Sequence, residues 1–227
     1  MIALIALLGN AAEPIIIGHR GAPGYLPDHT LASYELAIEL GADFIEPDLV
    51  STKDGALIAR HENELGDTTD VAEKFPARKT ERIIDGHRVT GWFAQDFTLA
   101  EIRTLRARQP MDCRDKRHDG QHGVPTFDEI LGLIDAHRAK GRIVGVYPET
   151  KHPSHHRAAG LPLEDKLVAA LQAHDLDRAD APVFIQSFEP SNLRDLAGAT
   201  KVRLVQLIGP PTADPPVLRP APPTATC

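Results

Sequence analysis

Three carboxylates stand in or at the ends of apolar, strand-like runs, where they could hold a metal ion. Glu46 and Asp48 lie two residues apart, so on a strand both side chains would project from the same face. Glu149 ends a later apolar run. Buried charge is costly unless it is paired or metal-bound, and three carboxylates favour a hard cation, Ca²⁺ or Mg²⁺, over zinc. The alternative is that each carboxylate forms a structural ion pair with an arginine.

Two histidines and two cationic residues stand at the ends of the same kind of run. A single histidine of this type is more often structural, but His19 and His61, bracketing a carboxylate pair, suit a general acid and a general base. Arg20 offers a planar fork for a phosphate, and Lys151 adds a point charge beside Glu149. With a cation, these residues indicate a site for an anionic substrate that undergoes proton transfer, and a phosphodiester fits well.

The elements that must position these residues alternate between strand and helix. Such alternation, with polar residues at strand ends, indicates an α/β fold, and in a (β/α)8 barrel the catalytic residues come from the C-terminal ends of several strands. Six strands are recognisable, too few to build a closed barrel from this chain alone. The predicted strands are 15–18, 44–50, 56–61, 143–149, 183–187 and 202–208, and helices are expected from about 30, from 98, over 127–140, over 163–174 and from about 191.

Local signals define several boundaries more closely. Asp54-Gly55 predicts a tight two-residue hairpin, which would place Asp48 directly across from His61. Thr98 with Glu101, and Thr126 with Glu129, are capping boxes that open two helices. Gly41 and Gly141 are expected to end the helices that precede them.

The chain divides into a main domain over 14–209 and two terminal segments. Residues 62–125 are polar and poorly periodic, and we expect them to form an inserted lid with one helix inside it. Residues 1–13 resemble a signal-peptide remnant without its positive region, or else an apolar lead-in that packs beneath the first strand. Residues 210–227 are rich in proline and are predicted to be disordered. The net charge of −7 argues against a nucleic-acid partner, and no segment is long and apolar enough to cross a bilayer.

The main motifs at these strand ends are His19-Arg20-Gly21-Ala22, Glu46-Pro47-Asp48, Thr52-Lys53-Asp54-Gly55, Arg60-His61-Glu62 and Tyr147-Pro148-Glu149-Thr150-Lys151. They resemble the motifs of the glycerophosphodiester phosphodiesterases, over about residues 14 to 208. Two further motifs, Gly24-Tyr25-Leu26-Pro27-Asp28-His29-Thr30 and Asp96-Phe97-Thr98-Leu99, resemble the bacterial periplasmic branch. This branch implies a periplasmic or secreted protein, with a cytoplasmic one as the alternative.

The resemblance implies a (β/α)8 TIM barrel of the phospholipase C-like type with an insertion after the third strand. It also implies hydrolysis of glycerophosphodiesters to an alcohol and sn-glycerol 3-phosphate, with Ca²⁺ or Mg²⁺ as the cofactor. The glycerol hydroxyl would attack phosphorus, and water would open the resulting cyclic phosphate. By motif position, the acid–base pair would be His19 and His61, the metal ligands Glu46, Asp48 and Glu149, and the phosphate-binding residues Arg20 and Lys151.

The main departure from the family lies after residue 208. Family members continue there with strands that close the barrel, so the resemblance implies an incomplete barrel that lacks its last strands. An open sheet edge favours association, and we expect low solubility, low activity or self-association. A rival enzyme class, an amidohydrolase-like hydrolase, usually needs a His-x-His pair at the first strand, where this chain has His19-Arg20. The non-enzyme alternative is a catalytically impaired barrel that acts as a binding or surface protein.

Overall fold

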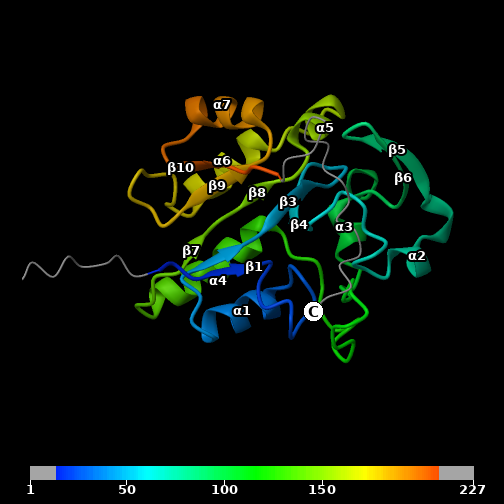
Figure 1. Ribbon diagram of the computed structural model, residues 1–227, viewed down its shortest axis with the longest axis horizontal. Coiled ribbons are helices and arrows are strands. Elements are labelled where there is room, and N and C mark those ends of the chain that lie inside the picture. The colour runs from blue at the N-terminus through cyan, green and yellow to red at the C-terminus, as the bar shows by residue number, and fades with distance from the viewer. Residues whose placement is uncertain (1–13, 210–227) are drawn as a thin grey trace, which may run out of the picture.

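The computed structural model describes residues 14–209 and shows a curved parallel sheet surrounded by helices (Figure 1). The predicted signal-peptide remnant and proline-rich tail lie outside these residues. Two of the predicted strands are each interrupted at a proline, Pro47 and Pro148, because proline has no N–H to donate to the ladder. The parallel strands are β1 (Ile17–His19), β2 (Phe44–Glu46) continuing into β3 (Asp48–Ser51), β7 (Gly145–Val146) continuing into β8 (Glu149–Thr150), β9 (Phe184–Ser187) and β10 (Arg203–Gln206).

The sheet is continuous but open within these residues. One group of strands has the order β1-β2-β7, and the other has the order β10-β9-β8-β3 with β4 (Leu57–Ala59) beyond β3. A parallel bridge between Val146 and Val183 joins the two groups. No pairing links β10 to β1 in the described part of the chain. The fold therefore has barrel-like curvature without closure between residues 14 and 209.

The hairpin after β3 differs from the predicted one. Its loop has three residues, with Thr52 N bonded to Ala56 O and Gly55 at a φ of 84°, a conformation that glycine adopts without steric cost. The register pairs Leu49 with Ala59, so Asp48 lies opposite Arg60 and the predicted Asp48–His61 pairing is wrong by one residue. Because β4 runs antiparallel to β3, it is a hairpin strand and not one of the parallel strands.

The helices that follow the parallel strands pack around the sheet. They are α1 (Leu31–Glu39), α4 (Phe127–Ala139), α6 (Glu164–Ala173) and α7 (Pro190–Ala199). Ile38 of α1, Ile45 of β2 and Leu131 of α4 belong to one buried apolar cluster between helices and sheet. The predicted caps are confirmed: Thr98 and Thr126 form capping boxes, and Gly141 follows α4 at a φ of 80°. A short helix, α5 (Pro153–Ala158), was not predicted.

Residues 62–125 contain more structure than the single helix expected. A second apolar cluster, which includes Leu65, Phe97 and Leu105, packs them against Val50 and Ile58 of the β3–β4 hairpin. In Figure 1 this segment lies beside the end of the sheet toward which β3 and β8 run. Its elements are α2 (Val71–Lys74), β5 (Thr80–Ile84), β6 (His87–Gly91), α3 (Leu99–Ile102) and two 3₁₀ turns, Pro76–Arg78 and Ala94–Asp96.

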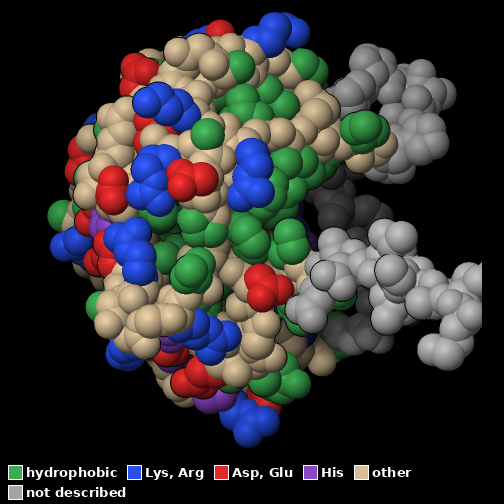
Figure 2. Space-filling view, turned by 90° about the vertical axis from the view of Figure 1, so that its left-hand side faces the viewer, with side chains coloured by type: hydrophobic (Ala, Val, Ile, Leu, Met, Phe, Trp, Pro, Cys, Tyr) green, Lys and Arg blue, Asp and Glu red, His purple; other side chains and the backbone are tan. Residues whose placement is uncertain are grey.

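The surface carries both signs of charge. On the face shown in Figure 2, acidic and basic side chains are interspersed, and apolar side chains lie between them. This face therefore has no continuous basic surface among the described residues. No helix in residues 14–209 combines the length and the apolarity that a bilayer crossing requires.

Candidate active site

The three predicted carboxylates meet where β2 continues into β3 and β7 continues into β8. Glu46 ends β2, Asp48 begins β3 and Glu149 begins β8, where the β3–β8 register places Asp48 beside Glu149. Each residue is at most 9% exposed, and one oxygen from each lies within 4.8 Å of the others. Because the three carboxylate oxygens lie this close together, the geometry suits a shared ion.

Burial and neighbouring charges of both signs set the pKa values of this cluster. Burial would raise the pKa of Asp48, but Lys151 and His29 outweigh burial and hold that pKa below its usual range. Burial raises the pKa of Glu149 to about 8, with Asp48 adding to the rise and Lys151 opposing it. Burial and the charge of Asp48 raise the pKa of Glu46 to about 7. Carboxylates this close resist ionising together unless a positive charge is added.

The donor set fits a hard divalent cation. Asp48 Oδ1 is buried and has no hydrogen-bond partner in the described structure, whereas Oδ2 takes a bond of 3.0 Å from His29 Nε2. A buried polar atom without a partner is rare because it loses its bonds to water without replacement, and a bound cation would supply the missing contact. Oxygen donors from Glu46, Asp48 and Glu149 match the preference of Ca²⁺ or Mg²⁺.

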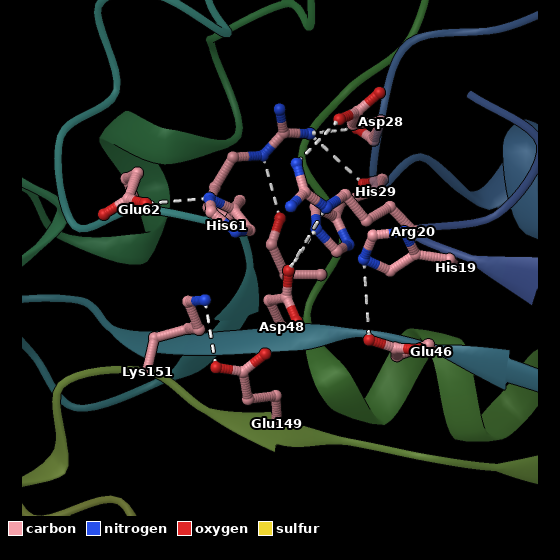
Figure 3. A network of polar contacts seen from close by, with 12 residues as sticks. His19, Arg20, Asp28, His29, Glu46, Asp48, His61, Glu62, Glu149 and Lys151 are labelled. Carbon is pink, nitrogen blue, oxygen red and sulfur yellow. Dashed lines mark hydrogen bonds and ion pairs between the residues drawn. The ribbon is translucent and has the colours of Figure 1, made fainter. Parts of the chain in front are cut away.

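The two predicted histidines lie on either side of Asp48 (Figure 3). The His19 side chain is 61% exposed, and its Nε2 lies 3.7 Å from Glu46 Oε1. Burial of part of the ring and the charge of Arg20 lower the pKa of His19. The Nδ1 of His61 lies 2.8 Å from Glu62 Oε1, which fixes the orientation of that ring. The structure therefore brings both histidines to the carboxylate cluster.

The predicted phosphate-binding residues lie beside the same cluster. Arg20 adopts a left-handed φ of 60°, and its guanidinium lies 3.6 Å from Asp28 and 3.8 Å from Asp48. Arg20 Nε is buried with no hydrogen-bond partner in the described structure. Lys151 is 4% exposed, and its Nζ lies 3.0 Å from Glu149 Oε1. Burial would lower the pKa of Lys151, but Asp48 and Glu149 outweigh it, so the residue stays cationic.

His29 and Tyr34 form a buried support for Asp48 that was not predicted. His29 Nδ1 lies 2.7 Å from Tyr34 Oη, and its Nε2 lies 3.0 Å from Asp48 Oδ2. Burial lowers the pKa of His29 to about 4, so the ring is neutral at pH 7. An ionised carboxylate only accepts, so Nε2–H donates to Asp48 and Nδ1 accepts from the tyrosine hydroxyl. The one available signal in the sequence is the place of His29 within a family motif.

Arg60 is a second support that was not predicted. The residue is 1% exposed, and its guanidinium donates to the carbonyl oxygens of Asp28 at 3.1 Å and His29 at 3.2 Å. These bonds connect β4 to the loop that carries Arg20 and His29. Gln186 of β9 donates a side-chain hydrogen bond that lowers the pKa of Glu46 against the effect of burial. Both contacts join segments that are far apart in the sequence, so no local sequence pattern could predict them.

The sequence matches a known family and curated relatives. Residues 19–223 match the glycerophosphoryl diester phosphodiesterase family. The chain is 40% identical over 206 residues to a glycerophosphodiester phosphodiesterase of Arabidopsis thaliana, covering 84% of this chain and 54% of the relative. It is 34% identical over 216 residues to one of Haemophilus influenzae, covering 87% and 57% respectively. The chain thus spans about half the length of the curated relatives it matches.

Solved structures share the fold. A glycerophosphodiester phosphodiesterase of Agrobacterium tumefaciens superposes with a TM-score of 0.58 at 26% identity, over 84% of this chain and 66% of that one. A phosphodiesterase of Oleispira antarctica, solved with the product sn-glycerol-3-phosphate, superposes with a TM-score of 0.59 at 23% identity, over 84% and 64%. The predicted (β/α)8-type fold is confirmed, with a sheet that stays open within residues 14–209. The chain therefore belongs to the glycerophosphoryl diester phosphodiesterase family.

Proposed function

We propose that this chain hydrolyses glycerophosphodiesters to an alcohol and sn-glycerol 3-phosphate. One observation carries the proposal: the family-motif residues, drawn from separate segments between His19 and Lys151, meet around the buried Asp48 (Figure 3). Family membership and the curated relatives support the same reaction class. The Oleispira antarctica neighbour holds the product that this reaction would release.

A divalent cation, Ca²⁺ or Mg²⁺, is proposed to be held by Glu46, Asp48 and Glu149. When bound, it would polarise a phosphoryl oxygen and neutralise charge that develops there. The buried free oxygen of Asp48 supports its placement. Arg20, whose buried Nε has no hydrogen-bond partner in the described structure, and Lys151 would hold the phosphate oxygens beside it.

His19 and His61 are proposed to move the protons. In the first step a glycerol hydroxyl bonds to phosphorus while the bond to the headgroup oxygen breaks. One histidine takes the proton of the attacking hydroxyl, and the other gives a proton to the departing alcohol. Water then opens the cyclic phosphate with the two histidines in exchanged roles. The position of the two rings on either side of Asp48 supports the assignment of one histidine as general base and the other as general acid (Figure 3).

Turnover of glycerophosphocholine by the purified chain tests the proposal. Formation of sn-glycerol 3-phosphate would be followed with added Ca²⁺ or Mg²⁺, after treatment with a chelator, and after the metal is restored. We expect product only with metal, and none in a matched His61→Ala variant. A folded chain that forms no product under any of these conditions would favour the non-enzyme alternative, a binding or surface protein on this fold.

A further inference from the structure

A row of four side chains leads from His61 away from the carboxylate cluster. His61 Nδ1 lies 2.8 Å from Glu62 Oε1, as Figure 3 shows, and Glu62 Oε2 lies 3.2 Å from His152 Nε2. His152 Nδ1 lies 2.8 Å from Asp85 Oδ2. The row joins the segment after β4, the residue before α5 and the turn between β5 and β6. None of these contacts follows from the motif positions alone.

Each carboxylate oxygen of Glu62 contacts a ring nitrogen of a different histidine. The Glu62 side chain is 44% exposed, so in water it would sample several rotamers unless both oxygens were held. His152 is 5% exposed, and its two ring nitrogens each face a carboxylate. Ionised carboxylates only accept hydrogen bonds, so both nitrogens of His152 must carry protons. His152 is therefore a buried imidazolium that holds Glu62 in place.

The backbone presents His152 and Asp85 to each other at some conformational cost. His152 has a φ of 44° and a ψ of 51°, a left-handed conformation that residues other than glycine rarely adopt. Asp85 and Gly86 form a two-residue turn with φ values of 50° and 80°, so the hairpin tip is well defined. Strained residues persist where their surroundings over-determine them, and here the two carboxylate contacts of the His152 ring do so.

We propose that His152 is a positioning residue that orients His61 through Glu62, and that Asp85 ties this arrangement to the β5–β6 hairpin. The inference rests on the proposed function, because it is that function which makes His61 a proton carrier. With Nδ1–H donated to Glu62, the neutral ring of His61 presents its Nε2 lone pair for proton exchange. Removing His152 frees Glu62 to rotate and releases His61 from that alignment.

Kinetics of four variants form the first part of the test. His152→Ala removes both contacts, His152→Gln keeps an amide that can donate to Glu62, and Asp85→Asn keeps the shape of the hairpin tip without its charge. The matched control is Glu81→Gln, which removes a carboxylate of the same hairpin that pairs only with Arg88 among the described residues. We expect kcat for glycerophosphocholine to fall by about ten- to a hundredfold in His152→Ala with KM nearly unchanged. His152→Gln should recover part of the loss, and Glu81→Gln should match the parent chain.

The second part needs no turnover. The imidazole resonances of His61 would be recorded by nitrogen-15 NMR in each variant and assigned with His61→Gln, while thermal unfolding reports whether each variant folds. We expect the Nδ1–H signal of His61 to change in His152→Ala, to change less in His152→Gln and to stay constant in Glu81→Gln. An unchanged His61 signal with parental kcat in a folded His152→Ala variant would overturn the proposal, and so would the same result in Asp85→Asn if His152→Ala does not fold. A His61 signal that responds in a chain without turnover would support the positioning role and contradict the proposed function instead.

Discussion

Asp48 is the residue on which the contacts of the site converge. His29 and Arg20 face its Oδ2, and its backbone oxygen accepts from Arg60 N at 2.9 Å. The contact from His29, together with the nearby Lys151, keeps a fully buried carboxylate ionised although burial opposes its charge. Its other side-chain oxygen, Oδ1, remains without a hydrogen-bond partner in the described structure. Asp48 and the histidines beside it can therefore be tested through metal affinity and through proton transfer.

Metal binding should depend on the carboxylates. A Glu46→Gln, Asp48→Asn double variant should lose its affinity for Ca²⁺ and Mg²⁺, because amides replace two of three carboxylate donors. Calorimetric titration measures this directly. Glu35→Gln, which changes a carboxylate of α1 paired with His137, is the control and should bind as the parent does. Unchanged affinity in the double variant would place the ion elsewhere.

Proton transfer should depend on both histidines. Replacing either His19 or His61 with alanine should lower kcat by at least about a hundredfold, the usual scale for a general acid or base. Steady-state turnover of glycerophosphocholine at saturating metal measures the effect. His87→Ala, at an exposed position of β6, should leave kcat unchanged. Near-parental turnover in either site variant would remove that histidine from the mechanism.

At the scale of elements, the segment 62–125 depends on a few internal anchors. Trp92 packs against the second apolar cluster, and its Nε1 donates to Phe75 O at 2.7 Å. Its backbone N donates to Glu64 at 2.9 Å. The ring therefore ties the end of the β5–β6 hairpin to the segment that follows α2. We infer that this segment caps the strand ends and contributes to headgroup selection.

Trp92→Ala tests the role of this cap. We expect it to raise KM more than it lowers kcat, because a loosened cap would lose binding energy shared by substrate and transition state. Trp92→Phe keeps an aromatic ring without the indole N–H and should show a smaller change. Steady-state kinetics gives kcat and KM separately, and two substrates, with choline and ethanolamine headgroups, allow the headgroups to be compared. A large fall in kcat at constant KM would indicate a catalytic role instead.

The capping box stabilises the N-terminus of α4, a helix that packs against the sheet. Thr126 accepts from Glu129 N at 3.1 Å, while Glu129 Oε2 accepts from Thr126 N at 2.8 Å. Thr126→Ala should lower the free energy of unfolding by about 1 kcal/mol, as the loss of an N-cap usually does. Urea denaturation should show a lower midpoint with an unchanged slope. Thr126→Ser retains the hydroxyl and should stay close to the parent.

At the scale of the whole molecule, buried neutral histidines make stability depend on pH. His156 is fully buried, with Nε2 3.1 Å from Asn63 Oδ1, and burial lowers its pKa to about 3. Its ordinary pKa is 6.5, so below that value the unfolded chain takes up a proton that the folded chain refuses. The contribution of neutral His156 to the stability of the folded chain is thus fully present above pH 6.5 and is lost as the pH falls toward 3. His29, with a pKa lowered to about 4 by burial, acts in the same direction.

His156→Gln should therefore flatten the pH dependence of stability. When the pH is lowered from about 7.5 to about 5, the free energy of unfolding should fall less in the His156→Gln variant than in the parent chain. The difference between the two falls should be about 2 kcal/mol. Hydrogen bonds to Asp85 and Glu62 raise the pKa of His152 to about 9, against the effect of burial. His152 therefore changes the pH dependence of stability in the opposite direction, but it does so equally in the parent and in the His156→Gln variant. Urea denaturation at the two pH values gives the comparison. An identical pH dependence in parent and variant would show that the pKa of His156 is the same in the folded and the unfolded chain.

The sequence alone determined the order of the main strands and helices outside residues 62–125, apart from the short helix α5, and seven residues of the site. Apolar periodicity, capping boxes and glycine stops act over a few residues, so the helix over 127–139 and the cap at Thr98 could be predicted closely. The seven predicted site residues are carried by local motifs at strand ends, and the structure brings all seven together. Their roles in catalysis and binding remain predictions.

Only the tertiary structure decided how those residues are supported. The three-residue loop at Gly55 shifted the hairpin register, because an Asp-Gly pair is compatible with more than one turn length. The partners of Asp48 and Glu62, namely His29 and His152, come from 19 and 90 residues away in the sequence. Such contacts depend on chain crossings and on which buried polar groups still need a partner, neither of which a local pattern records.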